Sequence, residues 1–98
     1  MEKIGVTEVR KILSEVFGGH DKLCASVANM PDDKLLKTNL RDEFGMDSLD
    51  FEDMFNEIYN LYGVVIDLCD PMAQSSFGKE PTVDNFIETV NHYLSIYT

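Results

Sequence analysis

Basic side chains are scarce in this sequence: eight lysines and arginines stand against eighteen aspartates and glutamates, for a formal net charge of −10. This balance argues against nucleic-acid binding, which needs a basic face for the phosphates. It also disfavours anionic membrane surfaces, and no apolar run approaches the roughly eighteen residues of a membrane-spanning helix. We therefore expect no membrane or nucleic-acid partner, and instead protein partners with basic docking patches.

Cysteine is scarce as well. Cys24 and Cys69 lie far apart, with no Cys-x-x-Cys or Cys/His spacing around them. This excludes the common zinc and redox motifs, and both thiols are expected to be small buried or half-buried side chains in a reducing cytoplasm. Residues 1–5 lack a basic stretch followed by an apolar run, so we expect no signal peptide and a cytoplasmic location.

The length and composition predict one folded domain over residues 1–98. An apolar fraction of 44%, with ten aromatic residues, is too high for a disordered chain. The small size and high charge favour a monomer.

Apolar residues recur at three- and four-residue spacing in three stretches, which predicts three helices. The first is expected to be capped by Thr7 and to stop at residues 18–19, both glycine; the second stops at Gly63, and the third is capped by Thr82. The stripes are Val6, Val9, Ile12, Leu13, Val16 and Phe17; then Phe51, Met54, Phe55, Ile58, Leu61 and Tyr62; then Val83, Phe86, Ile87, Val90 and Leu94. We expect an all-α fold, a small bundle of three main helices.

Two long connections join these helices. Residues 18–46 carry scattered apolar side chains, and residues 21–28 could form a short helix that helps to cover the bundle. Residues 63–67 read as a short extended segment that enters the core. Residues 67–81 are expected to form a loop, broken by prolines and a glycine, with room for one short helical turn.

The stretch from residue 42 to residue 70 is strongly acidic. It holds nine carboxylates and no lysine or arginine, and Ser48 lies within it at the expected start of the second helix. Such a run is often only a solvated face. However, like charges three and four residues apart cost a few tenths of a kcal/mol per pair, which favours a helix that serves a basic partner.

Catalytic interpretations of this stretch are weak. A serine nucleophile needs an activating base, and His20 and His92 lie far from Ser48 without a motif around either. Exposed, crowded carboxylates suggest no desolvated pocket for acid–base work. The acidic spacing also fails the calcium-loop pattern, so we expect no metal site and no catalytic residue.

The segment Gly45-Met46-Asp47-Ser48-Leu49-Asp50 resembles the signature of the acyl carrier proteins, small acidic helical bundles that bind phosphopantetheine. The hydrophobic and acidic residues 40–44 before it are similar to that family's approach to the motif. The end of the first helix, Ile66 after the second helix and the pair Thr82-Val83 agree as well. The resemblance covers most of the chain apart from its two long connections.

The resemblance implies that Ser48 carries a 4′-phosphopantetheine arm, transferred from coenzyme A by a phosphopantetheinyl transferase with the assistance of Asp47. The arm's thiol would hold acyl intermediates as thioesters, in fatty acid or polyketide-like biosynthesis, and acyl synthases and transferases with basic patches would be the partners. The implied partner-binding face consists of Leu49, Asp50, Asp53, Met54 and Glu57.

Several features depart from the family pattern. Both connections are longer than in compact members, and Tyr59 and Asn60 interrupt the acidic face. The family's third short helix is not evident in residues 72–79. A carrier of aminoacyl or other specialised units, an unmodified interaction module and a serine that only caps its helix therefore remain alternatives.

Overall fold

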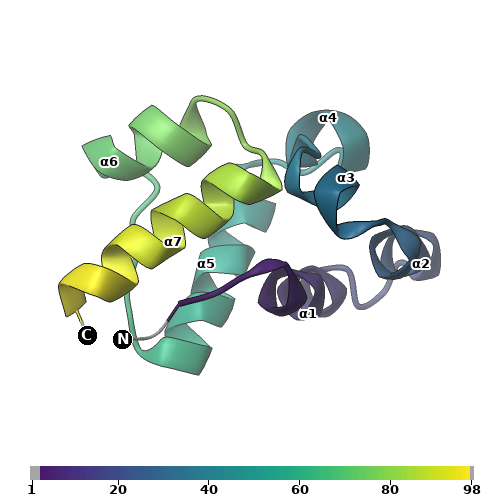
Figure 1. Cartoon of the computed structure of the whole chain (residues 1–98), viewed down its shortest axis with the longest axis horizontal. Coiled ribbons are helices and arrows are strands. Elements are labelled where there is room, and N and C mark those ends of the chain that lie inside the picture. Colours follow the sequence, from purple (N-terminus) through teal and green to yellow (C-terminus); the bar gives the residue numbers. More distant parts are fainter. Residues whose placement is uncertain (1–2, 98) are drawn as a thin grey trace.

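Seven α-helices and one π-helical segment make up the regular structure of residues 3–97, the part of the chain that the computed structural model describes (Figure 1). They are α1 (Val6–Val16), α2 (Asp21–Asn29), α3 (Asp32–Leu36), α4 (Leu40–Phe44), α5 (Ser48–Tyr62), α6 (Pro71–Ala73), η1 (Gln74–Gly78) and α7 (Val83–Tyr97). No strand occurs in this range, which confirms the all-α prediction. None of these helices combines the length and apolar character that a membrane crossing needs.

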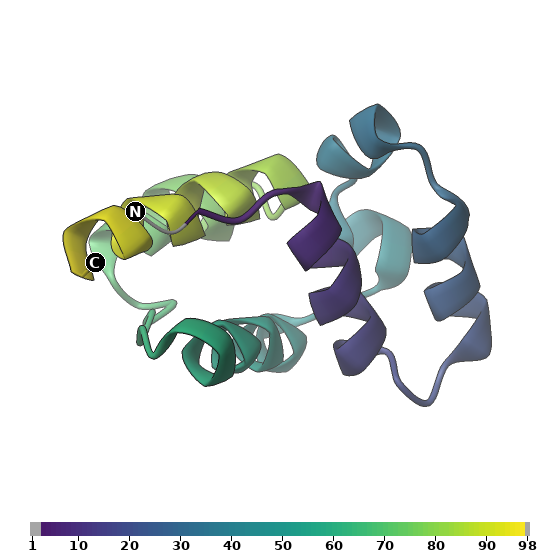
Figure 2. The same ribbon diagram turned by 60° about the horizontal axis from the view of Figure 1, so that its bottom comes forward.

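The three long helices form the core, as the periodicity predicts. In Figure 1 α7 crosses in front of α5, and Figure 2 separates them and shows α1 beside both. Their inward faces are almost completely buried because each presents one apolar stripe. These residues are Val9, Ile12 and Leu13 on α1, Phe51, Met54, Phe55 and Ile58 on α5, and Val83, Phe86, Val90 and Leu94 on α7.

The starts of α5 and α7 agree with the sequence prediction, whereas the start of α1 does not. Thr82 caps α7, since its hydroxyl oxygen accepts a hydrogen bond from the Asn85 amide at 3.3 Å. The predicted cap at Thr7 is wrong, because α1 already begins at Val6 and Gly5 is the residue before it. Glycine is also accepted at the N-cap position, although it has no side chain to accept a hydrogen bond. Thr7 is therefore a residue of the first helical turn and not the cap.

The connection between α1 and α5 is more helical than predicted. The expected short helix is present as α2, but α3 and α4 were not anticipated. Figures 1 and 2 both place these three helices together at one end of the molecule, where α2 packs against α1. Helices of five residues are too short to be stable alone, so this packing supports them.

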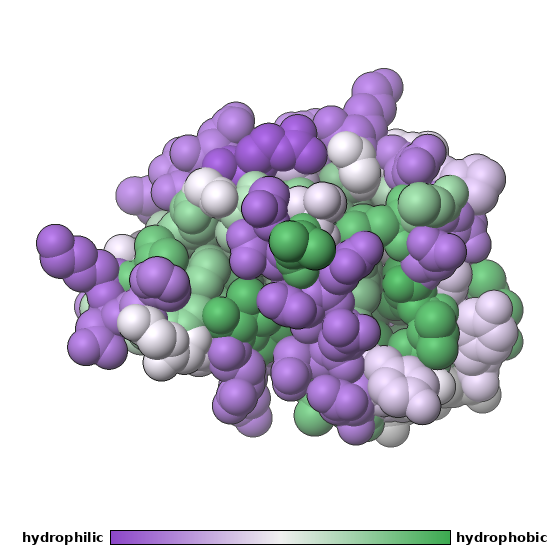
Figure 3. Space-filling model, turned by 180° about the vertical axis from the view of Figure 1, so that it is seen from behind, coloured by the Kyte–Doolittle hydropathy of each residue, from purple (hydrophilic) through white to green (hydrophobic). Residues whose placement is uncertain are grey.

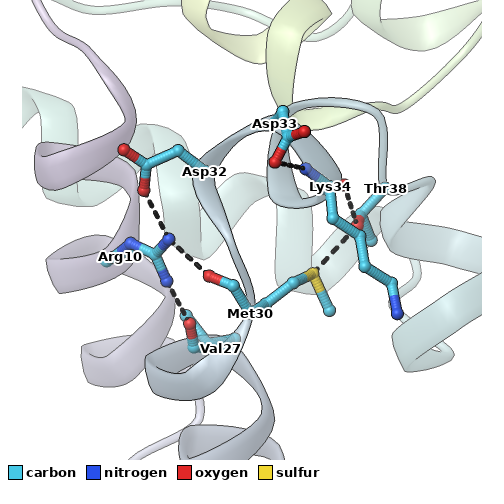
Figure 4. A network of polar contacts seen from close by, with 7 residues as sticks. All are labelled: Arg10, Val27, Met30, Asp32, Asp33, Lys34 and Thr38. Carbon is cyan, nitrogen blue, oxygen red and sulfur yellow. Dashed lines mark hydrogen bonds and ion pairs between the residues drawn. The ribbon is translucent and has the colours of Figure 1, made fainter.

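Arg10 on α1 holds the chain between α2 and α3 (Figure 4). Its guanidinium donates to the carbonyl oxygen of Val27, to that of Met30 at 2.6 Å and to the Asp32 carboxylate at 2.6 Å. The guanidinium offers several donors in a fixed geometry, so one side chain satisfies the carbonyls at the end of α2. The long connection is therefore an ordered layer over α1.

The segment after α5 enters the core as predicted. Gly63 ends the helix in the left-handed conformation, with φ of 72°. Val64 and Ile66 are then buried, whereas Val65 between them is exposed, which is the alternation of an extended chain.

Residues 71–78 correct the sequence interpretation. The loop was expected to leave room for one short helical turn, and the family's short helix was not evident in residues 72–79. The structure has more helix than this: α6 and η1 form one continuous segment, which packs on α7 through η1. Asp70 caps it by accepting a hydrogen bond from the Met72 amide, and Pro71 takes the first helical position, where proline is tolerated. The proline therefore begins this helix and does not prevent helix formation there.

Two distant segments meet at a short backbone bridge. Asn39 and Thr82 form an isolated antiparallel bridge. The Leu40 amide donates a hydrogen bond to the backbone carbonyl of Pro81 at 2.8 Å, and the Val83 amide donates one to the backbone carbonyl of Thr38 at 3.1 Å. The bridge joins the start of α4 to the start of α7. It therefore fixes the approach to α5 against the chain that follows η1.

Candidate functional site at the head of α5

A tight turn delivers the chain to Ser48. Gly45 ends α4 with φ of 66°, a left-handed conformation that residues with a side chain rarely adopt. Its amide donates a hydrogen bond to the backbone carbonyl of Arg41 at 3.0 Å. The next residue, Met46, is buried and anchors the turn in the core. The polar residues that follow are thereby held at the surface.

Asp47, not Ser48, caps α5. Its Oδ1 accepts hydrogen bonds from the amides of Leu49 at 3.0 Å and Asp50 at 3.2 Å, while the Asp50 carboxylate accepts from the Asp47 amide at 3.1 Å. This reciprocal capping box satisfies the free amides of the first turn. Ser48 is the first helical residue, and its side chain is exposed. The interpretation of Ser48 as a cap is therefore wrong.

Substitutions at Asp47 are expected to separate capping from charge. Asp47→Ala removes the acceptor of both amides and should lower the free energy of unfolding by about 1 kcal/mol. Asp47→Asn keeps an equally good capping oxygen and should change stability by no more than a few tenths of a kcal/mol. Urea denaturation of the two variants measures this difference, and equal losses would refute the capping role.

An open cavity of about 500 Å³ lies beside Ser48, between the head of α5 and the α6–η1 segment. Its lining includes Arg41, Ser48, Phe51, Glu52, Leu68, Cys69, Gln74, Gly78 and Lys79. The exposed Cys69 contradicts the expectation of a buried or half-buried thiol there, whereas Cys24 is half-buried as predicted. The two cations of this lining were not singled out by the sequence analysis.

A second open cavity of about 460 Å³ continues along α5. It shares Glu52 and Leu68 with the first and reaches Tyr59, Val65 and Ile66. The two cavities therefore lie end to end, in a groove between α5 and the residues that follow it.

Four phenylalanines close the core beneath this groove. Phe77 of η1 meets Phe51 and Phe86 edge to face, with ring centroids 4.9 and 5.6 Å apart, and meets Phe55 at 5.7 Å. Phe77 and Phe86 are fully buried, and the other two are nearly so. Aromatic rings at these distances pack tightly, so the groove ends at their surface and does not extend into the bundle.

The partner-binding residues implied by the resemblance fall on two sides of α5. Leu49 and Asp53 are exposed, and Asp50 and Glu57 are half-buried near them. Met54 is completely buried, so its placement on this face is wrong. The side of the molecule that includes α5 is largely hydrophilic, with apolar side chains between the polar ones (Figure 3).

The two histidines do not line the cavity beside Ser48. His20 precedes α2 and His92 lies on α7. No group of three or more histidine, cysteine or acidic side chains within residues 3–97 could hold a metal ion. These placements give no support to the interpretation of Ser48 as a hydrolase nucleophile.

The acidic surroundings also act on one buried tyrosine. Burial, with the charge of the nearby Asp70, raises the pKa of Tyr93 to about 12. Its hydroxyl has no hydrogen-bond partner within residues 3–97. Tyr93 therefore remains protonated at neutral pH and packs as a neutral side chain of the core.

Comparison with known proteins adds no relative. No protein-family model, no curated protein and no solved structure matches this chain. Function must therefore be inferred from the chemistry at the head of α5.

Proposed function

We propose that the chain is an acyl carrier protein that bears a 4′-phosphopantetheine arm on Ser48. The observation that carries the proposal is the position of this serine, exposed at the first turn of an acidic helix and beside an open cavity. Asp47 supplies the helix cap, so the Ser48 hydroxyl is free to take a substituent without loss of the helix.

The residues present fit such a group. Within residues 3–97 the Ser48 hydroxyl makes no hydrogen bond, and the cavity beside it offers both polar and apolar lining. When bound, the arm would supply a thiol that holds acyl groups as thioesters. Ser48 Oγ would lose its proton to a base of the transferase and form the new P–O bond. The P–O bond within the diphosphate of coenzyme A would break in the same step, and adenosine 3′,5′-bisphosphate would leave. Asp47 keeps its second oxygen, Oδ2, without a hydrogen bond within the described residues and available to that enzyme.

Incubation with coenzyme A and a phosphopantetheinyl transferase of broad specificity tests the proposal. We expect the intact mass to increase by one phosphopantetheinyl group, with the added mass on the peptide that contains Ser48. An unchanged mass, with a known carrier protein fully converted in the same mixture, would refute it.

The exposed part of α5 supports a basic partner. Leu49 offers an apolar contact, with 68% of its surface exposed, and Asp53 and Glu57 lie further along the helix. Carboxylates around one apolar anchor favour a partner surface with lysines and arginines around a pocket.

Removing charge from this face is expected to slow association with the transferase. Asp53→Asn combined with Glu57→Gln should lower the association rate about three- to tenfold at low ionic strength, and the difference should shrink in salt. The control, Glu15→Gln with Asp21→Asn, removes two exposed charges from the other end of the chain. Stopped-flow binding measures both pairs, and equal slowing would mean that only net charge matters.

A carrier of aminoacyl or other specialised units is the second candidate. The four phenylalanines beneath the groove favour it, because their packed rings occupy the core next to Ser48, where a long acyl chain would have to insert. Under either candidate, the cargo lies in the surface groove along α5. Mass spectrometry of the group on the arm, in protein from the native source, separates the two.

A further inference from the structure

We infer that Arg41 and Lys79 form an anion site that binds the phosphodiester joining the arm to Ser48. This inference rests on the proposed function and assigns a role to two residues outside the family motif. Its starting point is the distribution of charge. Lys79 is the only lysine or arginine after residue 41, in a stretch that carries twelve carboxylates.

The fold brings both cations to Ser48 from separate parts of the chain. The bridge between residues 38–40 and 81–83 ties the start of α4 to the chain just after Lys79. Arg41 and Lys79 consequently line the same cavity as Ser48. The Arg41 guanidinium also lies 6.0 Å from the centre of the Phe51 ring, a cation–π contact that holds it over the cavity.

Neither cation is neutralised by an ion pair. Within residues 3–97 the salt bridge between Arg10 and Asp32 is the only one. One carboxylate, that of Glu52, lines the cavity together with the two cations. Two unpaired cations and a single carboxylate beside Ser48, in a protein of net charge −10, favour an anionic ligand at this place.

The charge and position of the site select the ligand. A phosphodiester carries a single negative charge and two unesterified oxygens, which match one surplus positive charge and two donors. A phosphodiester linked to the Ser48 oxygen would lie at the edge of the cavity that Ser48, Arg41 and Lys79 line. Without these cations the added negative charge would face only the carboxylates of the α5 head.

The test compares apo and holo forms of three proteins. They are the wild type, Arg41→Gln/Lys79→Gln and the control Lys22→Gln/Lys34→Gln, which removes the same charge from exposed positions on α2 and α3. Modification should lower the melting temperature of the first double variant about 4 °C more than that of the wild type or the control. Equal changes in all three proteins would overturn the anion site and leave the proposed function intact.

A second measurement does not depend on converting the variant. In holo wild-type protein, the NMR signals of the Lys79 amide and the Arg41 Nε are expected to shift from their apo positions. If they stay in place while the Ser48 amide shifts, the site is overturned. If the wild type takes no arm at all, the proposed function fails and the anion site with it.

Discussion

Ser48→Ala is expected to abolish attachment of phosphopantetheine while changing the free energy of unfolding by less than about 0.5 kcal/mol. The two effects separate because Ser48 is exposed and Asp47 holds the helix start. Alanine lacks the oxygen that would form the phosphodiester, yet it is the best helix former. Intact-mass analysis measures the first effect and urea denaturation the second.

Ser26→Ala is the matched control for this variant. Ser26 is also an exposed serine on a helix, α2, but it lies far from the groove residues in sequence and does not line the cavity beside Ser48. The control should be modified as fully as the wild type. Modification of Ser48→Ala would show that another residue carries the arm, and unfolding of this variant would show that the serine is structural.

The largest effect on stability is expected from Phe77→Ala, at about 3–5 kcal/mol. Phe77 is fully buried and its ring contacts three other phenylalanines from α5 and α7. Its removal leaves a cavity among rings that cannot collapse without moving η1. Domains of this size are stable by about 5–15 kcal/mol, so this loss is a large part of the total.

Phe77→Leu keeps most of the buried volume and is expected to cost clearly less than the alanine variant. Urea denaturation of both variants gives the two free energies. A loss below about 1 kcal/mol in Phe77→Ala would show that η1 is not fixed by the aromatic cluster. The residues of η1 that line the Ser48 cavity would then not be held in place by this cluster.

The long helices could be predicted because each carries an apolar stripe and a clear stop or cap, although Leu61, predicted for the stripe of α5, is 58% exposed. Phe51, Phe55 and Ile58 mark the buried side of α5, and Gly63 ends it. The same period places Met54 on the buried side, so its assignment to a partner-binding face conflicted with the sequence pattern itself. The fold class thus followed from periodicity alone.

Of the short helices, α2 was predicted, but α3 and α4 could not be, because tertiary contacts stabilise them. α3 and α4 have five residues each, too few to show a period, and the Arg10 hydrogen bonds hold the chain that leads into α3. In the other connection, Pro71 was interpreted as a breaker but takes the first position of α6. Local signals at proline are ambiguous without the surrounding structure.

The serine of the candidate site was visible in the sequence, but its surroundings were not. The motif placed Ser48 at a helix start, and the structure moves the cap to Asp47. Arg41 and Lys79 are 38 positions apart in the sequence, and the backbone bridge between residues 39 and 82 helps to bring them to one cavity. The isolation of Lys79 among carboxylates was the one signal that could have indicated it.

The intact mass of the protein isolated from its native host tests the carrier proposal most directly. We expect the protein to be heavier than its unmodified form by a phosphopantetheinyl group, alone or with an acyl cargo, and the added mass to lie on the peptide that contains Ser48. The unmodified mass in protein from growing cells would contradict the proposal and favour an interaction module that never carries the arm.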